Sequence, residues 1–68
     1  MNKILRNEEA KRIGIRLIAL DGSNNTAVIK FPKLNEILAE DFIRKNGAKI
    51  TVTNGGFNSP EKLFEIAW

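Results

Sequence analysis

The clearest pattern along the chain is an apolar stripe at helical spacing within residues 33–46. Its members are Leu34, Ile37, Leu38 and Phe42. Intervals of three and four residues place such side chains on one face of a helix. Pro32 suits the start of a helix, and Gly47 suits the left-handed position just past its end. The pattern predicts a helix over 33–46 whose apolar face covers a sheet.

Three segments have the composition of β-strands, namely 13–20, 26–31 and 48–53, because they are rich in β-branched and apolar residues. Residues 21–25, Asp-Gly-Ser-Asn-Asn, predict a turn that joins the first two strands into a hairpin. The segment 13–20 is apolar on both faces, which indicates a central strand or one covered by a helix. In 48–53 apolar residues alternate with polar ones, which predicts one buried face. These apolar residues are Ala48, Ile50 and Val52.

Both ends of the chain are ambiguous. Residues 1–12 form either a basic arm or a short helix with Asn7 as its N-cap. The segment 59–68 follows a turn at 54–56 and opens on Ser-Pro-Glu, which favours the start of a helix. The alternative is a strand, on which three large side chains would point to the same face. These are Phe64, Ile66 and Trp68.

Taken together, the elements predict a single α+β domain spanning residues 1–68. A small sheet of three or four strands, in the order β-β-α-β with a short C-terminal element, is covered on one face by one helix. We expect the helix to bury its stripe against apolar strand residues. These are Ile15, Leu17, Ile29, Ile50 and Val52.

The composition excludes most chemistry. The chain has 68 residues, 43% of them hydrophobic, and it contains neither cysteine nor histidine. Disulfides and the usual zinc and haem ligand sets are therefore excluded, as are the commonest general base and the strongest nucleophile. We expect no catalysis, no cofactor and no metal. No apolar run has the length of a signal peptide core or of a membrane span, so we expect a cytoplasmic protein.

Charge is concentrated at one end of the chain. Residues 1–16 contain five cations and two acids, and so hold the whole net charge of +3. An excess of this kind suits an anionic partner such as RNA, although a solvated arm without a ligand has the same composition. The candidate nucleic-acid contacts are Lys3, Arg6, Lys11, Arg12 and Arg16.

Large aromatic residues near the C-terminus are candidates for a protein contact. They are Phe57, Phe64 and Trp68. Aromatic side chains often anchor protein interfaces, but a domain this small also needs them in its core. Both readings of these residues stay open at this point.

A short motif resembles a known family. Asn7-Glu8-Glu9, then Ile15-Arg16-Leu17-Ile18, then Asp21-Gly22 is similar to the opening of the N-terminal domain of bacterial translation initiation factor 3. The resemblance implies a final strand in place of a C-terminal helix. It also implies contact with the small ribosomal subunit through the cations between Arg6 and Arg16. The chain departs from the family in its longer helical stretch, and near Pro60, where the family has a proline-rich segment with a cysteine.

The leading hypothesis is a non-catalytic RNA- or ribosome-binding domain. The alternative is a small protein–protein interaction module, such as a phage- or plasmid-type inhibitor or a homodimeric adaptor. An exposed edge of the sheet would offer one route to a homodimer. The two hypotheses differ in whether the N-terminal cations or an apolar surface carries the binding.

Overall fold

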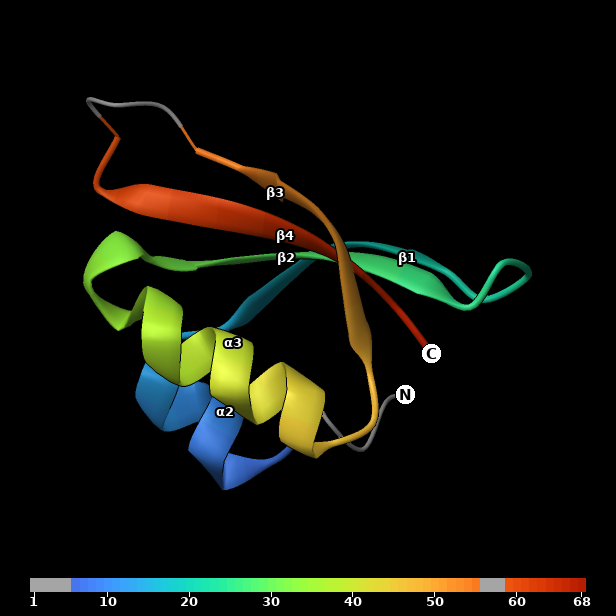
Figure 1. Ribbon diagram of the computed structural model, residues 1–68, viewed down its shortest axis with the longest axis horizontal. Helices are drawn as coiled ribbons and strands as arrows, with labels where there is room; N and C mark the ends of the chain where they lie inside the picture. The colour runs from blue at the N-terminus through green and yellow to red at the C-terminus, as the bar shows by residue number, and fades with distance from the viewer. Residues whose placement is uncertain (1–5, 56–58) are drawn as a thin grey trace.

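The structure is a computed structural model that describes residues 6–55 and 59–68. Two helices lie on one face of an open, four-stranded antiparallel sheet, which confirms the expected small α+β fold (Figure 1). The strand order is β1-β2-β4-β3. The elements are α2 (Glu8–Ile13), β1 (Arg16–Asp21), β2 (Thr26–Pro32), the 3-10 turn η1 (Lys33–Asn35), α3 (Glu36–Lys45), β3 (Lys49–Asn54) and β4 (Glu61–Ala67).

The helical alternative for the N-terminal segment is the one that forms. The Asn7 side chain caps α2 by accepting a hydrogen bond from the Glu9 backbone N–H at 2.8 Å. The helix ends at Gly14, whose φ of 88° suits a residue without a Cβ. A Cβ on Gly14 would lie 2.9 Å from Cδ of Pro32. Glycine at this position therefore lets the end of α2 pack closely against the end of β2.

The predicted helix over 33–46 is present as η1 followed directly by α3. It ends at Lys45, and the left-handed residue that follows it is Gly47, with φ 85°. Its buried face differs from the predicted one. The buried residues of α3 are Ala39, Phe42 and Ile43. The apolar residues from Leu34 to Ile43 together occupy an arc of about 240° around the helix axis, which is too wide for one contact face. Only Phe42 of the predicted stripe is buried, and the expectation for its other three members is wrong.

Strand β1 is an edge strand, so the prediction of a central or covered strand is wrong. All six of its residues are exposed. Leu17 pairs with Ile29 and therefore lies on the face of the sheet that carries the helices. The β1–β2 hairpin projects beyond the two helices, however, and they do not cover this strand (Figure 1). The expected burial of Leu17 is therefore also wrong.

The C-terminal segment forms strand β4, so the favoured helix is wrong and the alternative strand is correct. The Ser59 hydroxyl accepts a hydrogen bond from the Glu61 backbone N–H at 3.2 Å, so the local cap signal is present although no helix follows. Tertiary pairing overrides it, because β4 lies between β2 and β3 and pairs with both. Phe64 then enters the core, with its ring centroid 4.5 Å from that of Phe31. A strand at this place is also what the resemblance to initiation factor 3 implies.

The core lies between the sheet and the two helices. Among the described residues, the fully buried large side chains are Ile29, Phe31, Phe42, Ile43, Phe64 and Ile66. Strand β3 contributes less than its alternation predicts, because a bulge between Ile50 and Val52 shifts its register. Val52 consequently pairs with Glu65, which places it on the face away from the helices, and it is exposed. The expected burial of Val52 is therefore wrong, whereas Ile50 packs against the core.

Candidate binding surfaces

The largest departure from a closed core is on η1 and α3. The side chains of Leu34, Ile37 and Leu38 are 97%, 82% and 58% exposed. We call these three residues the α3 patch. Ile37 and Leu38 come three and four residues after Leu34, so both are its neighbours on one side of the helix, turned away from the buried face. Side chains of this size are usually in the core, and contiguous exposed apolar surface commonly marks an interaction site.

A second apolar group lies along edge strand β1. Leu17, Ile18 and Leu20 are 45%, 55% and 46% exposed. The register with β2 shifts between Leu17 and Ala19, so Ile18 sits at a bulge. Bulges and charged ends are common protections of an edge against further strand pairing, and this strand also begins at Arg16 and ends at Asp21. The side chains of the β1 group are therefore less exposed than those of the α3 patch, and the edge of β1 is protected against further strand pairing.

The predicted RNA-binding cations do not form one uncompensated patch. Lys11 pairs with Glu8 on the same helix, with 3.5 Å between Nζ and Oε1. Arg16 pairs with Glu61, and the same carboxylate lies 3.2 Å from Lys30. These carboxylates reduce the positive charge that a phosphate group would meet.

Two members of the predicted basic set remain more available. Arg6 and Arg12 are exposed, and neither forms an ion pair within residues 6–55 and 59–68. Lys3, the remaining member, lies outside the described residues. The structure thus leaves at most part of the predicted set free to contact an anion.

The aromatic candidates separate into different environments. Phe64 is completely buried, so it is not available to a partner, and its proposed role in partner binding is corrected to a core role. Trp68 is 37% exposed at the end of β4, where its backbone N–H donates to the carbonyl of Asn25 at 3.1 Å. Phe57 lies outside the described residues. Only Trp68 among them is shown with an accessible side chain.

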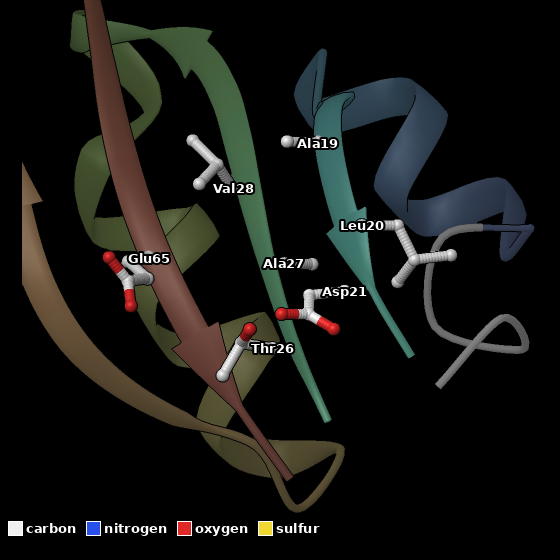
Figure 2. Close-up of a pocket in the computed structure, with 7 residues that line it drawn as sticks. All are labelled: Ala19, Leu20, Asp21, Thr26, Ala27, Val28 and Glu65. Atoms are coloured by element: carbon white, nitrogen blue, oxygen red, sulfur yellow. The ribbon is translucent and has the colours of Figure 1, made fainter. Parts of the chain in front are cut away.

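A shallow hollow of about 240 Å³ lies over β1, β2 and β4 near the hairpin (Figure 2). Its lining residues are Ala19, Leu20, Asp21, Thr26, Ala27, Val28 and Glu65. The Asp21 carboxylate accepts hydrogen bonds from the Ser23 backbone N–H at 3.1 Å and from the Asn24 side-chain amide at 2.7 Å. It therefore holds the turn. The hollow is smaller than the roughly 300–1,000 Å³ of typical small-molecule sites and brings no general base against a nucleophile.

Two further site types are absent from the described part of the chain. No group of three or more acidic, histidine or cysteine side chains is arranged to hold a metal ion there. None of the helices described has the length and apolar character needed to cross a membrane. The apolar surfaces are the features of this structure that most need an explanation.

Sequence reasoning missed the α3 patch because it assigned the whole apolar stripe to one buried face. A signal was available, since six apolar residues between Leu34 and Ile43 occupy more of the helix circumference than one sheet can cover. The resemblance to initiation factor 3 directed the prediction to the N-terminal cations instead. No protein-family model, no curated protein and no solved structure matches the chain.

Proposed function

We propose that this chain is a small, non-catalytic cytoplasmic domain that acts by binding another protein through the α3 patch. The observation that carries the proposal is the exposure of Leu34, Ile37 and Leu38 on one side of a helix. When a partner covers such side chains, their burial stabilises the complex by about 25 cal/mol per Å² of apolar surface removed from water. A helix face with anchors at these spacings is a common mode of protein recognition.

RNA or ribosome binding, the leading hypothesis from the sequence, is the second candidate. Arg6 and Arg12 support it, because they are exposed and unpaired among the described residues. Lys11 and Arg16 support it less, because carboxylates already compensate them. The apolar patch therefore favours protein binding over RNA binding, and the two candidates rest on different residues.

One co-purification experiment separates the two. The tagged chain is immobilised at several hundred micromolar as bait, so that weakly bound partners are retained, in a lysate of the cells that produce it, with and without nuclease. The variant Leu34→Ser/Ile37→Ser removes the patch, and Arg6→Ser/Arg12→Ser is the matched control. We expect the patch variant to lose at least about ten-fold in captured protein, because fully burying a Leu or Ile side chain is worth about 1.5–3 kcal/mol. The arginine variant should capture as much as the unaltered chain.

The opposite outcome supports the RNA reading. Capture that survives loss of the patch, but is lost with the arginines, with nuclease or with added salt, would overturn the protein-binding proposal. Binding to phosphates weakens steeply with salt because bound counterions are released, whereas burial of apolar side chains does not. Circular dichroism of each variant shows whether the fold is intact.

A further inference from the structure

We propose that the partner of the α3 patch is a second copy of this chain, bound through an antiparallel pairing of η1–α3 with the same segment of its partner. The inference rests on the proposed function and names the occupant of that surface. It comes from the charges that flank the patch, which are complementary to themselves under two-fold symmetry.

Most charged residues of η1 and α3 are already engaged within one copy. Glu40 pairs with Arg44 at 2.9 Å, Lys45 pairs with Glu9 of α2 at 3.5 Å, and Glu36 pairs with Lys62 of β4. The two others, Lys33 and Asp41, are exposed and form no ion pair with any described residue. One cation and one anion are thus left uncommitted on this segment.

These two residues are placed symmetrically about the patch. Lys33 is four residues before Ile37, and Asp41 is four residues after it. Ile37 and Asp41 are four apart in one row of α3, and such rows are the ridges that interdigitate when helices pack, whereas Lys33 opens the 3-10 turn that leads into α3. Lys33 thus stands at one end of the patch and Asp41 at the other, with the apolar side chains between them.

A two-fold axis through Ile37 would bring the apolar side chains and the opposite charges of the two copies together. It sets Ile37 against Ile37 of the second copy and Lys33 opposite the second copy's Asp41, and the reciprocal pair forms by symmetry. Leu34 and Leu38 flank the axis and exclude water from the contact. Each copy then supplies both halves of the charge complementarity, which a partner of unrelated sequence would need to match by chance.

The size of the patch sets the expected strength. A stable interface uses about 800 Å² per partner, which is about a sixth of the 4621 Å² exposed by this chain. Three side chains with two flanking charges cover less than that. The dimer should therefore be weak and reversible, with a dissociation constant on the order of 10–100 µM.

The test is a charge exchange measured by sedimentation equilibrium at low ionic strength. Lys33→Glu alone and Asp41→Lys alone each place like charges opposite one another twice per dimer, so each should weaken association about ten-fold. The double variant Lys33→Glu/Asp41→Lys should recover it. A mixture of the two single variants should also form heterodimers as strong as the unaltered dimer, because every charge then faces its opposite. Lys49→Glu is the control, since this exposed lysine on β3 makes the same charge change outside the patch.

The outcomes separate this inference from the proposed function. A chain that stays monomeric at several hundred micromolar, or single variants whose mixture does not recover, would overturn self-pairing. Patch-dependent capture of a different protein would then still support the proposed function. Loss of both self-association and patch-dependent capture would overturn both.

Discussion

Replacing Phe64 by alanine should lower the free energy of unfolding by about 3–5 kcal/mol. A domain of this length has only about 3–10 kcal/mol in total, so a large fraction of the molecules should unfold. Phe64 is completely buried on β4 and packs against Phe31. Its removal leaves a cavity under the strand that joins β2 to β3. Urea unfolding followed by circular dichroism measures the change.

Glu65→Ala is the matched control, because Glu65 is the next residue of the same strand and is exposed on the opposite face. It should change the free energy of unfolding by less than about 0.5 kcal/mol. A strand of period two requires this contrast between neighbours. Similar small losses at both positions would mean that Phe64 is not in the core.

Phe42→Ala and Leu38→Ala should differ strongly although both residues belong to the same apolar stripe of α3. Phe42 is 2% exposed and Leu38 is 58% exposed. We expect Phe42→Ala to lower the free energy of unfolding by about 3–5 kcal/mol, and Leu38→Ala to lower it by less than about 1 kcal/mol. The measurement is the urea midpoint of each variant at low protein concentration, where self-association does not contribute.

A loss above about 2 kcal/mol for Leu38→Ala at low concentration would place this side chain in the core of one copy. The α3 patch would then lose one of its three members. Repeating the measurement at high protein concentration adds a second readout, since a dimer that uses Leu38 should show a larger loss there.

Much of the fold was predictable because its signals are local. The Asn7 cap, the turn at 21–25 and the left-handed glycine after α3 each act within a few residues, and the structure has all three. The alternation in β3 was also recognisable. Its bulge was not, because a shift of register depends on the neighbouring strand, and it turns Val52 to the other face.

The errors in the fold come from non-local pairing. Ser59, Pro60 and Glu61 carry a helix-start signal, and the hydrogen bond from the Glu61 N–H to the Ser59 hydroxyl does form. A strand wins because without it β2 would lose one of its two neighbours and β3 would lose the one strand that it pairs with. Likewise, the composition of β1 is typical of a covered strand, but the sheet order places it at an edge. The order of strands in a sheet cannot be predicted from the residues of one strand.

The α3 patch was not predicted from the sequence for a related reason. Periodicity places Leu34, Ile37 and Leu38 on a helix, but it does not say which part of a wide apolar arc faces the sheet. The sequence also shows that Arg16 is charged, but not that this charge is compensated by Glu61, which comes from the distant strand β4. Binding surfaces depend on what the fold leaves uncovered and unpaired, and both properties arise only when distant segments meet.

The α3 patch should be the surface through which this chain associates. The most direct measurement is a dilution series of amide and methyl NMR spectra of the unaltered, isotope-labelled chain, from low to high micromolar concentration. We expect the chemical shifts of residues 33–41 alone to change with concentration. These changes should fade in Leu34→Ser/Ile37→Ser. Shifts that centre on Arg6 and Arg12 or on β1, or spectra that do not change with concentration, would contradict this expectation.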